Sequence, residues 1–439
     1  MSSIQSITLY SRSFYNRVKK SSLFKDAGIY TFYNIIDRSV PFLLLPVITR
    51  ILEPEQYGIY GAFQALIIIV LPLISLNTDS SILRNYFSLD QEKFRSYFSN
   101  GILIYICCSI LTIVFFYLFR EFLGGLVNFP NNWLIFAVLI CAFQYLIDLE
   151  LNLLQITKNP KKYGIFKISN TLCKNILMLT MILYFSFKWE GLVIGHFATA
   201  FLFGVISIYL FFRKKLFVNN INKKYLADNI KFGAPLTLHR IGGWMQEQAT
   251  RIILNMLLGA SFTGNLIAGA SFGLIIALLQ DSFNKAFVPY LFEKLQNISE
   301  NSKRKLVKLT YIYNSALLLM AIFVGIIAYF YSGFVLGANY KNAGLYTIWI
   351  AVGYAFDGMY KMHVNYIFYE KKTQYIFYIT IISGIITVLL SFIFIKSYGA
   401  IGAGYAITIG FFCSYILAWI IAQRVYPMPW FPTFKSLKI

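Results

Sequence analysis

Acidic residues and histidine, which supply many catalytic acids, bases and metal ligands, are scarce in this sequence. Its 439 residues include 18 Asp and Glu and three His, against 39 Lys and Arg. The five cysteines lie inside apolar runs, and none forms a Cys-x-x-Cys pair. The phosphate-binding pattern Gly-x-x-x-x-Gly-Lys-Ser/Thr does not occur. We therefore expect no disulfide framework, no metal site, no cofactor and no ATP hydrolysis by this chain.

Long polar segments are also missing. The longest connector that we place on the outer side of the membrane, residues 120–132, is too short for a folded domain. Catalysis by a separate soluble domain is therefore excluded, and any function must reside among the apolar segments. A polysaccharide polymerase or membrane glycosyltransferase is disfavoured because such enzymes usually carry a large external loop. We expect a protein that is not an enzyme.

The abundant feature is hydrophobic sequence, since 58% of the residues are apolar. An apolar helix of about 20 residues spans a bilayer, and the chain holds about twelve runs of this length. We place them at Ala27–Ile51, Tyr57–Leu76, Gly101–Phe119, Trp133–Ile156, Gly164–Phe187, Gly191–Phe212, Phe232–Met256, Gly264–Phe287, Leu306–Tyr331, Ala343–Tyr369, Gln374–Ile395 and Ala400–Ala422. The sequence therefore predicts an all-α polytopic membrane protein.

The basic residues gather in alternate connectors. The opposite connectors hold only single bases, namely Arg50, Arg120, Lys188, Lys341 and Lys396. Because positive charge resists translocation, we predict that both termini are cytoplasmic. Residues 1–26 are basic and lack an apolar core, so they are not a cleavable signal peptide. We expect the basic connectors to contact anionic lipids and not nucleic acid.

A weak internal repeat divides the chain. Asp37-Arg38 and Thr49-Arg50-Ile51 in the first run correspond to His239-Arg240 and Thr250-Arg251-Ile252 in the seventh. We therefore predict two pseudo-symmetric six-helix lobes around a central cavity, as in transporters with parallel repeats. The predicted boundaries are a cytoplasmic basic segment at 1–26, lobes at 27–212 and 232–424, a basic cytoplasmic connector at 213–231 and a cytoplasmic tail at 425–439.

Two short motifs carry a family resemblance. The pattern Arg-x-Leu-x-Pro-x-x-Tyr-Gly-x-Tyr is met by Arg50, Leu52, Pro54, Tyr57, Gly58 and Tyr60. The second motif follows as Asn77-Thr78-Asp79 and Arg84-Asn85-Tyr86-Phe87. Both resemble bacterial polysaccharide transporters of the multidrug/oligosaccharidyl-lipid/polysaccharide exporter superfamily.

This resemblance implies an O-antigen or capsule-type flippase of the bacterial inner membrane. Such a protein moves an oligosaccharide repeat unit on undecaprenyl pyrophosphate from the cytoplasmic to the outer leaflet by alternating access. The implied partners are this lipid-linked oligosaccharide and the polymerase and chain-length machinery of polysaccharide synthesis, including that of lipopolysaccharide. A drug or ion antiporter of the same superfamily is the alternative, and the bases described next favour an anionic cargo over a cationic drug.

Charges inside the apolar runs indicate where the cargo passes. A charge at mid-bilayer costs about 2.5–3.5 kcal/mol on insertion scales, so it faces a partner or water. Glu247 with Arg251, Asp281 with Lys285, and Asp357 with Lys361 are each an acid followed by a base at i,i+4. This spacing is typical of intrahelical ion pairs. The acid and base of each pair therefore either mainly neutralise each other or, where the cavity is hydrated, also contact the cargo.

Arg38, Lys174 and Arg240 have no acid at this spacing. Asp37 adjoins Arg38 but points about 100° away around the helix. Arginine binds phosphate in bidentate fashion, so Arg38 and Arg240 are candidates to hold the pyrophosphate. The alternative is a bridge between helices, for example to Asp148 or Glu150. Further candidates are Lys174, Arg251 and Lys361 for the anionic cargo, and Asp37, Asp148, Glu247, Asp281 and Asp357 for binding a coupling ion.

Overall fold

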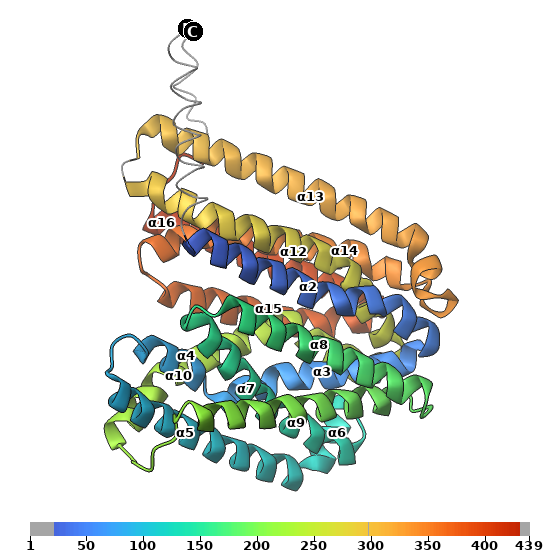
Figure 1. Ribbon diagram of the computed structural model, residues 1–439. Helices are drawn as coiled ribbons and strands as arrows, with labels where there is room; N and C mark the ends of the chain where they lie inside the picture. The colour runs from blue at the N-terminus through green and yellow to red at the C-terminus, as the bar shows by residue number, and fades with distance from the viewer. Residues whose placement is uncertain (1–21, 297, 431–439) are drawn as a thin grey trace. The chain divides into compact units, whose positions relative to one another are not determined.

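In this computed structural model, residues 22–296 and 298–430 are described, and their regular structure is entirely helical (Figure 1). The long helices are α2 (Ser22–Ile51), α3 (Pro54–Ser75), α5 (Gln91–Leu118), α7 (Leu134–Ile156), α8 (Pro160–Leu183), α9 (Trp189–Arg213), α10 (Lys223–Glu247), α12 (Ala260–Gln296), α13 (Glu300–Leu336), α14 (Ala343–Tyr369), α15 (Gln374–Tyr398) and α16 (Ile401–Val425). The short elements are α4 (Thr78–Asn85), α6 (Arg120–Val127), η1 (Asn131–Trp133), α11 (Ala249–Leu258) and η2 (Ala338–Tyr340).

Eleven of the twelve predicted runs each coincide with one long helix. The exception is the run 232–256, which is divided at Gln248 into α10 and α11. α2 is helical throughout its length and contains both Pro41 and Pro46.

Eight helical segments in the described residues are long and apolar enough to cross a membrane. They are the segments that contain α3, α5, α7, α9, α12, α13, α15 and α16. The other long helices, α2, α8, α10 and α14, carry most of the charged residues that we singled out within the apolar runs. The chain is thus an all-α, multi-pass membrane protein in which a subset of the helices is polar.

The helices pack into two compact units. The first comprises Met1–Leu44, of which residues 22–44 are described, with Asn77–Cys107 and Leu139–Lys231. The second comprises Leu45–Leu76, Cys108–Val138 and Phe232–Ile439, of which the residues from 431 on are outside the described range. The two lobes at 27–212 and 232–424 remain a prediction, as does the cytoplasmic segment at 1–26.

The core of the second unit surrounds α14, which packs against α12, α13 and α16. Tyr346, Ile350 and Tyr354 of α14 are buried there with residues of these neighbours. The α3–α12 contact is close because Gly58 and Gly264 face each other's backbone. A Cβ on Gly58 would lie 1.8 Å from the carbonyl oxygen of Ala260, and one on Gly264 would lie 1.9 Å from that of Pro54.

The first family motif forms part of this packing. Arg50 Nη2 donates to the carbonyl of Phe334 at 3.1 Å, and the buried Tyr340 donates its hydroxyl to the carbonyl of Leu52 at 2.9 Å. Pro54 occupies the first turn of α3, where its missing N–H costs nothing. The motif therefore fastens the α2–α3 connection to the end of α13 and to η2.

Candidate functional site

In the first unit, the polar residues of α2 and α8 form a cluster. Lys167 Nζ donates to Asn34 Oδ1 at 2.6 Å and pairs with Asp37 Oδ2 at 3.3 Å. Thr171 donates to the other oxygen of Asp37, and the Tyr163 hydroxyl donates to Asn34 Oδ1 at 3.1 Å. The Lys167 and Asp37 side chains are 21% and 23% exposed, so this ion pair is mostly shielded. Asp37 is thereby placed with a base of a neighbouring helix.

The remaining predicted residues of this unit lie near that cluster or along the same helices. Lys174 is half-buried one helical turn beyond Thr171 and interacts electrostatically with Asp37 and Asp148. Asp148 accepts a hydrogen bond from Gln144 Nε2 at 2.8 Å. Arg38 is exposed on α2. Asp148 and Glu150 were proposed as alternative partners for Arg38, Lys174 and Arg240, and Glu150 is bound by Lys214 through both carboxylate oxygens.

In the second unit, a lysine of α14 joins two carboxylates. Lys361 Nζ lies 2.6 Å from Asp281 Oδ1 of α12 and 3.0 Å from Asp357 Oδ2, one turn away on α14. Gln280 Nε2 donates to Asp357 Oδ2 at 2.6 Å. The predicted pair of Asp357 and Lys361 is confirmed. Asp281, which we paired with Lys285 on its own helix, reaches across to the same ammonium group.

Two carboxylates share one ammonium in this cluster, so its formal charge is negative. The three side chains are between 22% and 32% exposed. Glu247 adds a further acid, which interacts electrostatically with Asp357, Arg251 and Lys361. Such a group can take up a cation or a proton and is less suited to hold an anion.

The other candidates of the second unit have diverse surroundings. Arg240 is exposed on α10 and Arg251 is half-buried on α11. His239 Nδ1 lies 3.1 Å from Thr380 Oγ1 of α15, a polar contact between two helices. Trp244 donates its Nε1 proton to the carbonyl of Ala65 at 2.7 Å. Tyr354 is 6% exposed in the apolar core, so it has a structural role.

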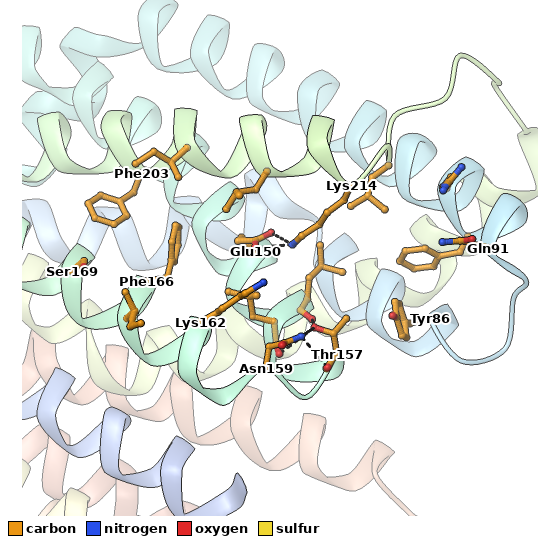
Figure 2. A pocket seen from close by; sticks show the side chains of 18 of the residues that line it. Tyr86, Gln91, Glu150, Thr157, Asn159, Lys162, Phe166, Ser169, Phe203 and Lys214 are labelled. Carbon is orange, nitrogen blue, oxygen red and sulfur yellow. Dashed lines mark hydrogen bonds and ion pairs between the residues drawn. The ribbon is translucent and has the colours of Figure 1, made fainter.

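A cavity of about 1060 Å³ lies in the first unit among the ends of α5, α7, α8 and α9 (Figure 2). Glu150, which is 1% exposed, accepts from Lys214 Nζ at 2.6 and 2.7 Å within its lining. Figure 2 shows Lys162 reaching toward the same carboxylate. The sequence did not single out this cavity, because the residues that form it come from four separate helices.

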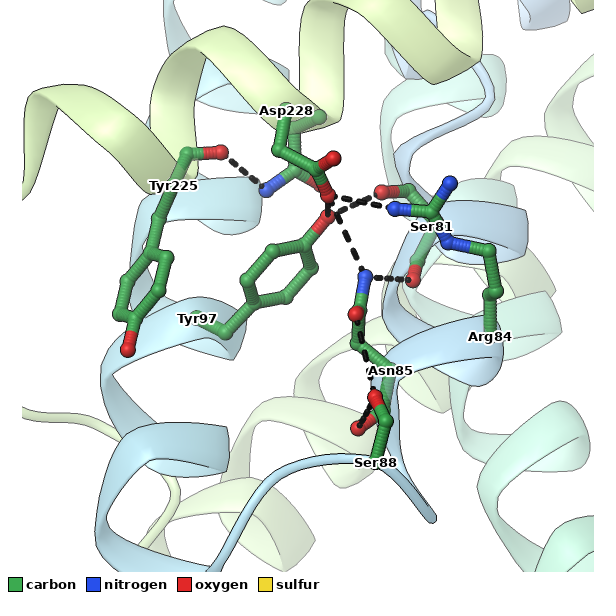
Figure 3. A network of polar contacts seen from close by, with 8 residues as sticks. Ser81, Arg84, Asn85, Ser88, Tyr97, Tyr225 and Asp228 are labelled. Atoms are coloured by element: carbon green, nitrogen blue, oxygen red, sulfur yellow. Dashed lines mark hydrogen bonds and ion pairs between the residues drawn. The ribbon is translucent and has the colours of Figure 1, made fainter.

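The second family motif forms a polar network with the start of α10 (Figure 3). Asp228 Oδ2 accepts from Arg84 Nη2 and from the Tyr97 hydroxyl, each at 2.6 Å, and from Asn85 Nδ2 at 3.4 Å. Asp228 precedes the predicted span 232–256. The hydrogen bond from Tyr97 and the guanidinium of Arg84 hold the pKa of Asp228 below its ordinary value. The motif therefore anchors α4 to α10.

Sequence reasoning found most of the charged members of the two clusters and did not single out Gln280 or Asn284. Gln280 and Asn284 flank the Asp281 cluster, and Asn365 Nδ2 donates to Asn284 Oδ1 at 2.8 Å. The available signal was the adjacency of Gln280 and Asp281 within an otherwise apolar run. Lys167 was visible as a base on α8, and its partner Asp37 could be identified only once α2 and α8 were placed side by side.

The sequence is similar to proteins of polysaccharide biosynthesis. A family profile described as polysaccharide biosynthesis protein matches residues 23–295. The capsular polysaccharide biosynthesis protein CapF of Staphylococcus aureus is 24% identical over 419 residues, which cover 90% of this chain and 97% of CapF. Lsg locus putative protein 1 of Haemophilus influenzae is 23% identical over 386 residues, which cover 83% of this chain and 90% of that protein.

Solved structures share the fold. The lipid II flippase MurJ, in an inward closed conformation, superimposes with a TM-score of 0.68 at 15% identity, covering 90% of this chain and 87% of that chain. An inward-facing multidrug resistance transporter of the MATE family, from the MOP superfamily, has a TM-score of 0.62 at 13% identity, covering 90% and 94%. At these identities the likeness concerns the fold alone.

Proposed function

The chain belongs to the polysaccharide biosynthesis protein family, and on this basis we propose that it is a flippase for lipid-linked oligosaccharides. Its cargo is a repeat unit of O-antigen or capsular type on undecaprenyl pyrophosphate. It moves this cargo from the cytoplasmic to the outer leaflet of the bacterial inner membrane by alternating access, with both termini in the cytoplasm. The polymerase and chain-length machinery receive the flipped unit.

The observation that carries this proposal is the presence of ionised clusters within membrane helices of both units. An ionised side chain in a bilayer is costly unless it faces a partner, water or cargo, and such residues usually mark a transport pathway. The Asp37–Lys167 pair and the Lys361 cluster with Asp281 and Asp357 remain 21–32% exposed. A membrane protein with only a scaffolding role would not need partly accessible charges on polar helices in each unit.

We assign the anionic end of the cargo to arginine. Arg38 and Arg240 are both exposed on their helices, and a guanidinium matches the geometry of phosphate oxygens. Lys174 and Arg251 are half-buried and add positive charge without needing direct contact. Lys361 was a further candidate for the anion, but two carboxylates balance its charge, so we assign it to coupling.

The coupling ion binds at the Lys361 cluster in this proposal. Asp281 and Asp357 share one ammonium, so a proton or a sodium ion that neutralises one of them removes the excess negative charge. Glu247 lies within electrostatic reach of this group, and Asp37 and Asp148 are the corresponding acids of the first unit. Neutralisation would loosen the α12–α14 contact and thereby couple ion binding to the change of conformation.

The test is genetic complementation. Deleting the gene in its host should abolish surface polysaccharide and leave lipid-linked repeat units in the cytoplasmic leaflet. Arg38→Ala and Arg240→Ala should each reach the membrane at normal levels and fail to restore export. The matched control is Arg213→Ala, which removes an exposed arginine at the end of α9 and should restore export fully.

The two levels of this proposal fail separately. Normal surface polysaccharide in the deletion strain, in a host without a second transporter of this family, would refute the flippase. Full export by both arginine variants would refute the assignment of the pyrophosphate and leave the flippase standing. Loss of export by Arg213→Ala as well would show that export responds to positive charge in general.

A further inference from the structure

We propose that the cavity of the first unit is a binding site for an anionic phospholipid, with the phosphate at its basic end and the acyl chains along its apolar wall. The site is separate from the clusters assigned to the cargo and the coupling ion. Its residues come from the ends of α5, α7, α8 and α9. An occupant would therefore bridge the ends of four helices.

The charge of the lining is the first argument. The lining contains three bases, Arg95, Lys162 and Lys214, and a single carboxylate, Glu150, so the formal charge of the site is positive. Glu150 accepts from Lys214 through both carboxylate oxygens, and one carboxylate balances only one of the three bases in the lining. Among the described residues, no hydrogen-bond partner reaches the buried Nε of Arg95. An anion in the cavity would supply the missing hydrogen-bond acceptor.

The apolar part of the lining is the second argument. Ile165 and Phe166 of α8 line the cavity opposite Phe203, Ile206 and Leu210 of α9. Ile165 is 66% exposed, as expected of a side chain that meets lipid. A free phosphate ion would fill a small part of about 1060 Å³ and would leave this wall without a partner. A phosphate ester with hydrocarbon chains matches both parts.

The expected membrane depth is the third argument. The helix ends that form the cavity adjoin basic connectors that the positive-inside rule places on the cytoplasmic side. The inner leaflet there carries anionic lipid, and basic pockets between helices on this side bind acidic headgroups. The cavity thus lies where headgroups of the required charge are abundant.

The experiment is native mass spectrometry of the full chain, purified in detergent and titrated separately with phosphatidylglycerol and phosphatidylcholine. We expect one phosphatidylglycerol to be retained at concentrations at which phosphatidylcholine is lost. Arg95→Gln and Lys162→Gln should each weaken retention about fivefold, which corresponds to about 1 kcal/mol for a basic residue beside an anionic headgroup. Lys214 is left unchanged because its loss would strand the buried Glu150.

The matched control is Lys161→Gln, which removes the same charge from the adjacent, exposed position outside the lining and should bind as the wild type does. Equal retention of phosphatidylcholine would overturn the proposal, and so would an equal loss in Lys161→Gln. If inorganic phosphate displaced the lipid completely at equal concentration, the site would be one for free anions. If undecaprenyl pyrophosphate alone depended on Lys162, the cavity would belong to the cargo.

Discussion

Adding one methyl group at Gly58 should separate two helices, whereas the same change three residues later should not. In Gly58→Ala the new Cβ would lie 1.8 Å from the carbonyl oxygen of Ala260 and 2.7 Å from the backbone nitrogen of Gly264. Both obstacles are main chain and cannot rotate away, so α3 and α12 must move apart. In Gly61→Ala the new Cβ meets the Cδ1 atom of Ile267, which a change of side-chain rotamer removes.

The expected magnitudes differ accordingly. Overpacking against rigid surroundings costs about 1–3 kcal/mol and occasionally more. We expect a cost at the upper end of this range for Gly58→Ala, because its new Cβ would contact the backbone of both Ala260 and Gly264. Gly61→Ala gains up to about 1 kcal/mol of helix propensity, which offsets the repacking of Ile267. In a chain of 439 residues a cost of about 3 kcal/mol lowers the apparent melting temperature by roughly 3 °C. We expect a fall of this size for Gly58→Ala and little change for Gly61→Ala.

The assay is thermal unfolding of the detergent-solubilised protein followed by tryptophan fluorescence, with size-exclusion chromatography as a measure of folded yield. Failure of Gly58→Ala to accumulate as folded protein would agree with the prediction only if Gly61→Ala accumulates normally. Gly264→Ala, which meets the carbonyl oxygen of Pro54 at 1.9 Å, should behave like Gly58→Ala. Equal melting temperatures for Gly58→Ala and Gly61→Ala would refute the argument from close backbone approach.

Three further predictions concern polar contacts. The pKa of Asp228 is lowered in the folded state, so the ionised carboxylate stabilises the fold fully above the ordinary carboxyl pKa of about 3.9. This stabilisation is lost as the pH falls through the lower folded pKa. The stabilities of Asp228→Asn and wild type, measured by unfolding at pH 3 to 7, should therefore converge only at the acid end. Lys361→Met should destabilise by about 1–3 kcal/mol, less than for a fully buried pair, and further Asp281→Asn and Asp357→Asn changes should restore most of the melting temperature. Tyr340→Phe should cost about 1 kcal/mol in urea or thermal unfolding, and no change would contradict the buried hydrogen bond.

Helix positions could be predicted because length and hydropathy decide them, whereas the break within the seventh run could not. Proline usually breaks or bends a helix, yet α10 continues through Pro235. The break occurs at Gln248, a residue with no breaking tendency of its own, where the N–H of Arg251 bonds to the carbonyl of Gln248 at 3.0 Å in a tighter turn. Tertiary packing rather than local sequence sets this position.

Some ion pairs could be predicted from the sequence and others could not. Asp357 and Lys361 are one turn apart on a single helix, so their spacing alone predicts the contact. Asp281 is 80 residues from Lys361, and its choice of partner depends on how far α12 slides along α14. The bridge between Glu150 and Lys214 likewise joins helices that are not consecutive in the chain. Contacts within a helix follow from periodicity, and contacts between helices require the register of their packing.

The lengths of α12 and α13 have a consequence for the membrane surface. Each helix has 37 residues, or about 55 Å at 1.5 Å per residue, against a hydrocarbon thickness of about 30 Å. Standing upright, the pair would extend well past the lipid headgroups at the end where Lys294 and Lys303 lie. This hairpin would then form a rigid projection beyond the membrane surface, accessible to antibodies and to soluble proteins without any need to enter the bilayer.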